Sequence, residues 1–138
     1  MSSPIEDYGI IGNTYTAALV SRGGSIDWLC LPRFDSESVF GALLGEPKHG
    51  RWLIEPAAEV VRRSRRYRGD TGILETQFET AEGCVTLIDF IALTDREEQI
   101  DLIRLVMAMH QQRMIVIAVE SQEILAAVDS EIGHGGTR

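Results

Sequence analysis

The chain has few cysteines and no long apolar run, and these absences exclude several classes of protein. Only two cysteines, Cys30 and Cys84, occur in 138 residues, so a dense disulfide framework is excluded. Neither lies in a CxxC or zinc-type spacing, and both lie in apolar, strand-like segments. We therefore expect reduced core cysteines in a cytoplasmic protein, with a disulfide as the alternative.

Signals for export and for membrane insertion are also missing. Residues 1–12 carry Glu6 and Asp7 where a secretory signal needs positive charge, and no apolar h-region follows. No apolar run is long enough to span a bilayer. The formal charge of -8 disfavours nucleic acid and anionic membranes as partners. A neutral, polyhydroxylated ligand meets no such repulsion.

The common motifs of catalytic and cofactor sites are absent as well. His49, His110 and His134 are far apart in the sequence, and none of them begins an HExxH pattern. Gly23 and Gly24 lack the Lys-Ser/Thr that follows in a phosphate loop, and no GxSxG elbow occurs. We expect no metal, no cofactor and no catalytic residue in this chain.

Short strand-like segments separated by turns make up most of the first hundred residues. Residues 14–21 and 25–31 flank a Gly-Gly turn and predict a hairpin, because adjacent glycines permit the positive φ of tight turns. The spacing of roughly ten residues between strands predicts a mainly β fold, an antiparallel β-sandwich. The further predicted strands cover residues 50–55, 59–61, 73–80, 84–90 and 101–109.

Two helices are expected beside these strands. Asp35 and Ser36 can cap a short helix near residues 36–44, which Gly45 would end. In the tail, residues 114–119 predict a strand and residues 121–132 have helix-like spacing. The expected domains are a sandwich over residues 1–113 and a divergent tail over residues 114–138. The apolar residues expected on one face of the first helix are Val39, Phe40, Leu43 and Leu44.

One local run of positive charge interrupts this acidic sequence. It predicts a charged edge strand that discourages aggregation, or ion pairing to an acidic partner domain. Its members are Arg62, Arg63, Arg65, Arg66 and Arg68, with Tyr67 between them.

Several segments together resemble the N-terminal, trehalase-like domain of bacterial trehalases and glucoamylases of glycoside hydrolase family 15. The resemblance covers about a hundred residues, fades beyond Val106, and implies a supersandwich-like β domain. The segments are IEDYG (5–9), IGN (11–13), SIDW (25–28), PRFDS (32–36), SVF (38–40), GRW (50–52), RYRGDT (66–71), LET (74–76) and DF (89–90).

The resemblance also implies where the chemistry of such proteins lies. Family members are similar in carrying their catalytic glutamates in an α/α-barrel that follows the sandwich. Twelve helices of about 12 residues need on the order of 140 residues, which exceeds this chain. We therefore expect an inactive domain that docks to and orients a missing barrel, which hydrolyses α-glucosidic bonds with inversion.

Four residues are the candidates for substrate binding or for docking to that barrel. Trp28 and Trp52 offer flat apolar faces to a sugar ring, and Arg33 and Asp35 can hydrogen-bond its hydroxyls. Alternatively, both tryptophans fill the space between two sheets and Arg33 pairs with a carboxylate.

Two other functions remain open from the sequence. One is a stand-alone module that binds protein or α-glucosides such as trehalose or maltose. The other is a truncated remnant of such a hydrolase, whose apolar edges favour self-association.

Overall fold

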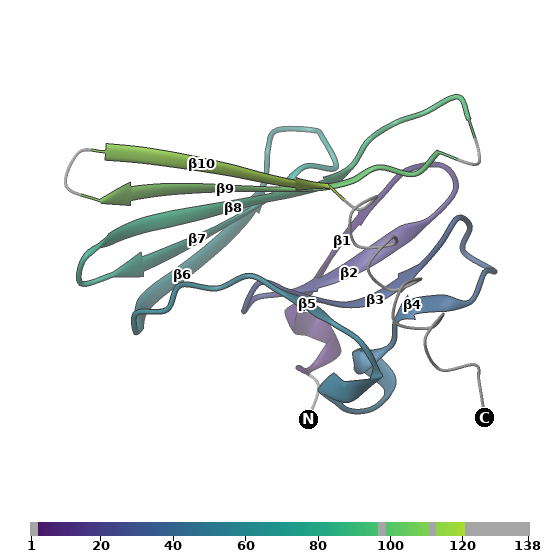
Figure 1. Cartoon of the computed structure of the whole chain (residues 1–138), viewed down its shortest axis with the longest axis horizontal. Helices are drawn as coiled ribbons and strands as arrows, with labels where there is room; N and C mark the ends of the chain where they lie inside the picture. Colours follow the sequence, from purple (N-terminus) through teal and green to yellow (C-terminus); the bar gives the residue numbers. More distant parts are fainter. Residues whose placement is uncertain (1–2, 97–98, 111–112, 121–138) are drawn as a thin grey trace, which may run out of the picture.

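Two antiparallel sheets form the body of this computed structural model, which describes residues 3–96, 99–110 and 113–120 (Figure 1). The predicted antiparallel, mainly β sandwich is confirmed. Sheet A has the order β1 (Tyr8–Gly12), β2 (Ala17–Ser21), β3 (Ser25–Cys30) and β4 (Ser38–Phe40), with β5 (Trp52–Leu53) paired to β3. Sheet B has the order β10 (Arg113–Glu120), β9 (Leu102–His110), β8 (Gly83–Ile91), β7 (Leu74–Thr80) and β6 (Val60–Tyr67). Short 3-10 turns cover Ile5–Asp7 (η1), Ala42–Leu44 (η2) and Pro47–His49 (η3).

The core lies between the inner faces of the two sheets. In β7, Leu74, Thr76 and Phe78 are buried while Gln77 between them is exposed, as the alternation of the sequence predicts. Both sheets contribute to one apolar cluster, which makes them a single packed unit. The cluster contains Ile11, Ala18, Val20, Ile26, Leu29, Phe40, Leu74, Ile91, Ile100 and Leu102.

The predicted Gly-Gly hairpin joins β2 to β3 and also contacts sheet B. Gly24 has a φ of +86°, in the left-handed region that favours glycine. A Cβ atom there would lie 2.2 Å from the Ile54 carbonyl oxygen and 3.3 Å from side-chain carbons of Leu87 and Phe78. The turn therefore needs glycine both for its backbone conformation and for its close packing.

The helix expected near residues 36–44 is largely replaced by other structure. Ser38 and Phe40 pair with Cys30 and Leu29 of β3, and only the 3-10 turn η2 follows them. Phe40 is buried whereas Leu44 is 79% exposed, so the apolar residues do not share a helix face. Pairing with the neighbouring strand has overridden the helical spacing.

Strands β1 and β10 are the first and last strands in the described part of the chain. Strand β1 was not expected, because Gly9 and Gly12 weaken its strand pattern. Strand β10 covers the predicted strand 114–119, whereas the predicted helix 121–132 lies outside the described residues.

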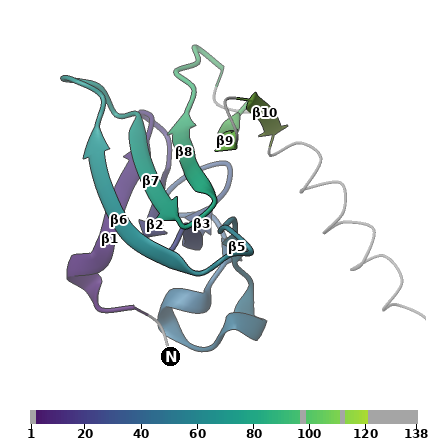
Figure 2. The same cartoon turned by 90° about the vertical axis from the view of Figure 1, so that its left-hand side faces the viewer.

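Strand β6 carries four arginines of the run along one edge of sheet B, and Arg68 follows directly after its end, so the predicted charged edge strand is confirmed. Arg65 leaves this strand toward sheet A, where its Nη1 donates to the carbonyls of Asp7 (2.9 Å) and Val20 (3.1 Å). The Tyr67 hydroxyl donates to the Ile10 carbonyl (2.8 Å) and accepts from the Ile10 N–H (3.0 Å). Tyr67 thus fastens β6 to β1, which lies close to it in Figure 2, and Arg65 fastens β6 to Asp7 of η1 and Val20 of β2.

Candidate functional site

The loop that follows β3, residues 31–36, is exposed and has a fixed backbone. The Phe34 N–H donates to the Tyr15 carbonyl (3.0 Å), and the Ser36 N–H donates to the Arg33 carbonyl (3.1 Å). The Ser36 Oγ accepts from the Arg33 N–H at 3.1 Å. Phe34 is nevertheless 62% exposed, and Arg33 and Asp35 beside it are also exposed. The loop thus presents an ordered aromatic and charged tip to solvent.

The neighbouring turn, residues 13–16, supports this loop through hydrogen bonds. The Asn13 Oδ1 accepts from the N–H groups of Tyr15 (2.9 Å) and Thr16 (3.0 Å), and its Nδ2 donates to the Ala92 carbonyl (3.4 Å). The buried Thr16 hydroxyl donates to the Cys30 carbonyl at 2.5 Å. The loop tip is therefore tied to the ends of β3 and β8.

Two of the four predicted site residues meet at the tip of this loop. Arg33 Nε lies 3.2 Å from Asp35 Oδ1, so the alternative prediction that Arg33 pairs with a carboxylate is confirmed. With Thr14, Tyr15 and Phe34 they line a hollow of about 390 Å³. Exposed ion pairs of this kind contribute roughly 0–1 kcal/mol to stability. The pair thus contributes little to the stability of the fold.

Trp28, the third predicted residue, lies on the outer face of sheet A. A β-bulge lets Leu19 pair with Trp28 while the next residue, Val20, pairs with Ile26. Trp28 is half-buried. On the opposite side of β2, Leu19 pairs with Ile10 of β1, which is 58% exposed. Ile10, Leu19 and Trp28 thus form an apolar row across β1, β2 and β3.

The same bulge places Asp27 where it fastens β1 to β3. Both carboxylate oxygens accept hydrogen bonds, Oδ2 from the Tyr8 hydroxyl and Oδ1 from the Ser25 hydroxyl, each at 2.5 Å. Burial, together with the hydrogen bond to Asp27 and its charge, raises the pKa of Tyr8 to about 12. Asp27 is buried, and these two hydrogen bonds engage both of its carboxylate oxygens.

Trp52, the fourth predicted residue, belongs to a separate cluster between the sheets. The fully buried Arg104 of β9 donates from Nε to Asp89 Oδ1 (2.7 Å) and from Nη2 to Asp89 Oδ2 (3.3 Å). It also donates to the carbonyls of Trp52 (2.6 Å) and Gly24 (2.7 Å), with its Cζ 5.0 Å from the Trp52 ring centroid. Burial raises the pKa of the Asp89 carboxyl, and the Arg104 guanidinium opposes this shift.

The Arg104 cluster links the two sheets, and Trp52 packs against the core. For Trp52 the space-filling interpretation is supported, whereas Trp28 faces outward from sheet A. As residues for substrate binding or docking, Trp28, Arg33, Asp35 and Trp52 stay predictions. The sequence analysis missed the Asp89 and Arg104 pair, although each is a lone charge in an apolar strand segment.

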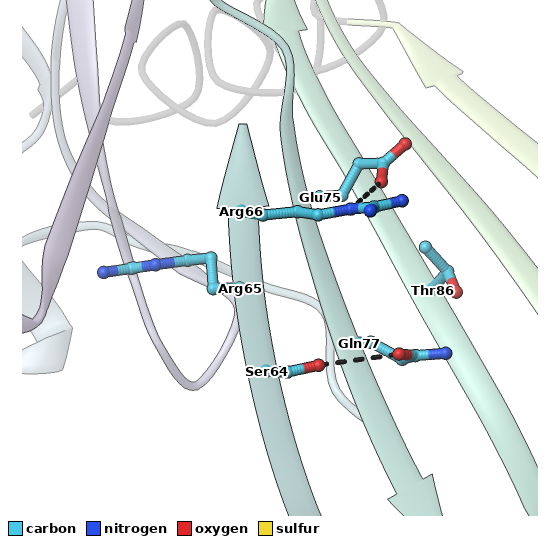
Figure 3. Close-up of a pocket in the computed structure, with 6 residues that line it drawn as sticks. All are labelled: Ser64, Arg65, Arg66, Glu75, Gln77 and Thr86. Atoms are coloured by element: carbon cyan, nitrogen blue, oxygen red, sulfur yellow. Dashed lines mark hydrogen bonds and ion pairs between the residues drawn. The ribbon is translucent and has the colours of Figure 1, made fainter. Parts of the chain in front are cut away.

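A polar hollow of about 350 Å³ lies on the outer face of sheet B (Figure 3). Arg66 Nε is 3.1 Å from Glu75 Oε2, and Arg68 also pairs with Glu75. The hydrogen bond from Arg68 is the main cause that lowers the pKa of Glu75. Figure 3 shows Arg65 pointing away from the other side chains, toward sheet A. The other lining residues are Ser64, Gln77 and Thr86.

Cysteines, possible metal ligands and possible membrane-spanning helices are the remaining features on which the sequence bears. Cys30 and Cys84 are free thiols, and Cys30 is buried as expected, but Cys84 is only half-buried on sheet B. Within residues 3–96, 99–110 and 113–120, no three His, Cys, Asp or Glu side chains are grouped to hold a metal ion. Over the same residues, no helix has the length and apolarity needed to cross a membrane.

The fold and the braced loop define a two-sheet β-sandwich domain, and comparison with known proteins gives its family. Residues 1–122 match the family described as Trehalase-like, N-terminal, and the chain belongs to this family. A trehalase of Mycolicibacterium smegmatis is 40% identical over 90 residues, which cover 65% of this chain and 13% of that protein.

Other relatives give the same result. A trehalase of Mycobacterium tuberculosis is 38% identical over 90 residues, which cover 65% of this chain and 13% of that protein. Trehalase 1 of Sulfolobus acidocaldarius is 39% identical over 92 residues, which cover 67% of this chain and 16% of that protein. No solved structure matches the chain significantly. The matched region is therefore a small part of each of these trehalases.

Proposed function

We propose that this chain is a non-catalytic N-terminal domain of a trehalase- or glucoamylase-like hydrolase. In this proposal it docks to an α/α-barrel outside these residues and orients that barrel, which hydrolyses α-glucosidic bonds. The observation that carries the proposal is the match to a trehalase-like N-terminal family in a chain that covers 13% of the M. smegmatis trehalase.

The hydrogen bonds of the two buried carboxylates support the proposal that glycoside hydrolysis takes place outside this chain. An inverting glycosidase needs an acid and a base about 6.5–9.5 Å apart, with room for a water between them. Asp27 and Asp89 instead have both carboxylate oxygens engaged by donors of this chain. Each holds two parts of the sandwich together, so neither is available for that chemistry.

The loop 31–36 is the best candidate for the docking surface. Phe34 supplies exposed apolar area, and Arg33 and Asp35 supply charges of both signs. Because the backbone is already fixed, docking would cost little conformational entropy. The parent substrate in this proposal is trehalose or another α-glucoside, the parent family is glycoside hydrolase family 15, and the free thiols agree with a cytoplasmic location.

A mixing experiment tests the docking proposal. The M. smegmatis trehalase lacking its matching 90-residue segment would be titrated with this chain and followed by calorimetry. We expect saturable binding that Phe34→Ala weakens roughly 10- to 150-fold, since burying a phenyl ring contributes roughly 1.5–3 kcal/mol. Val61→Ala is the matched control, because Val61 is 74% exposed on β6. No binding, or equal effects of both variants, would contradict the proposal.

The outward position of Trp28 favours one second candidate, a carbohydrate-binding module. Titration with trehalose, maltose and glucose would then shift tryptophan fluorescence, and Trp28→Phe would abolish the shift. A flat response with all three sugars removes this candidate.

A further inference from the structure

The two edge strands of sheet B differ in how they are protected. Strand β6 carries most of the arginine run and is fastened to β1 through Tyr67 and to β2 through Arg65. Strand β10 has the sequence RMIVIAVE, with six consecutive apolar residues and neither proline nor glycine. It pairs with β9 from Arg113 to Glu120, and no other described strand pairs with its outer edge. Long apolar edges of this kind are ready templates for strand pairing.

We propose that this edge pairs with β10 of a second copy of the chain about a two-fold axis, which joins two B sheets into one. The two-fold requires that one residue lies opposite itself, and the sequence favours Val116 at this position. Ile115 then lies opposite Ile117 of the second copy, and Met114 opposite Ala118. The central pairs are β-branched, which suits cross-strand packing. With Ile117 at the axis, Met114 would lie opposite Glu120.

The remaining edges limit this association to a dimer. In an isologous contact both copies use the same edge, here β10, so the dimer has no free β10 edge to which a third copy could bind. The other edge of sheet B is the arginine-rich β6. Val116 pairs with Met107 of β9. Met107 is three residues from the buried Arg104 on the same strand, so these two residues lie on opposite faces of sheet B. By register, position 116 belongs with Met107 to the positions that alternate with the buried residues of β9, and it is therefore the position chosen for a charged substitution.

Charge substitutions at the axis test the proposal. Sedimentation of the full chain over a range of concentrations should show a monomer–dimer equilibrium. Val116→Lys and Val116→Glu each place like charges opposite each other and should raise the dissociation constant about tenfold. An equal mixture of the two variants should restore the dimer, because Lys then lies opposite Glu. Val61→Lys and Val61→Glu on β6 are the matched controls and should leave the equilibrium unchanged.

Cross-linking tests the register without adding charge. Val116→Cys should form a disulfide between copies, since directly opposed residues have Cα atoms about 4.5–5.5 Å apart. Ala118→Cys on the same face would lie about 14 Å from its own copy and should not cross-link. The unaltered chain gives the background from Cys30 and Cys84. Four results would overturn the proposal. They are a chain that stays monomeric, a β10 edge covered by another segment, a mixture of the two variants that fails to dimerise, and equal cross-linking at positions 116 and 118.

Discussion

Removing the Arg104 guanidinium tests how the two sheets are held together. Arg104→Met keeps an unbranched apolar chain but leaves the Asp89 carboxylate buried without its cation. Loss of one partner of a buried ion pair costs about 3–5 kcal/mol. The carbonyls of Gly24 and Trp52 also lose their donor. Because whole domains are stable by only about 5–15 kcal/mol, we expect a loss of about 4 kcal/mol, much of the total.

Urea unfolding followed by circular dichroism and tryptophan fluorescence measures this loss. The double variant Arg104→Met/Asp89→Leu removes both charges and should recover at least half of the lost stability, since no unpaired buried charge remains. A single variant that loses less than about 1 kcal/mol, or a double variant less stable than the single, would refute the reasoning.

The pH dependence of the same variant has a definite sign. Burial raises the pKa of Asp89, and without Arg104 nothing opposes that rise. The folded state then binds a proton more tightly than the unfolded state, so stability falls as pH rises above the ordinary carboxyl value of 3.8. The stability lost by Arg104→Met should therefore be smaller near about pH 4 than near about pH 7.

Three further tests, two of them with a matched control substitution, address other parts of the structure. Gly24→Ala should cost about 2–4 kcal/mol in urea unfolding, because of its positive φ and the Ile54 carbonyl. Gly23→Ala should cost under about 1 kcal/mol, since an added Cβ would lie 3.8 Å from the Ser21 hydroxyl oxygen. Thr76→Val should be neutral or stabilising by about 1 kcal/mol, since the buried Thr76 hydroxyl has no hydrogen-bond partner. Thr16→Val should destabilise, because the Thr16 hydroxyl donates to the Cys30 carbonyl. A Thr76→Val variant less stable than Thr16→Val would contradict this. Tyr8→Phe should remove the ionisation step near pH 12 from the absorbance titration at about 295 nm, where phenolates absorb; an unchanged titration would show that the step belongs to another group.

The sequence was most informative where a pattern depends on local chemistry. Alternation in residues 73–80 and the Gly-Gly turn predicted β7 and the hairpin, because strand period and turn conformation are local properties. The helix near residues 36–44 was a misinterpretation, since pairing of Phe40 with Leu29 depends on a neighbouring strand.

The candidate site was predictable only in part for the same reason. Arg33 and Asp35 are two residues apart, so their pairing was foreseeable from the sequence. The contact of Arg104 with Gly24 spans 80 residues, and only the assembled sheets bring the two together. Lone charges within apolar strands, such as Asp89, were the one available signal.

The central claim, that catalysis lies outside this chain, is tested most directly by trehalose hydrolysis. Glucose release would be measured for the purified chain and for an M. smegmatis trehalase whose matching 90 residues are replaced by those of this chain. The account predicts no turnover by the chain alone and activity in the chimera. Turnover by the isolated chain, or a folded chimera without activity, would contradict it.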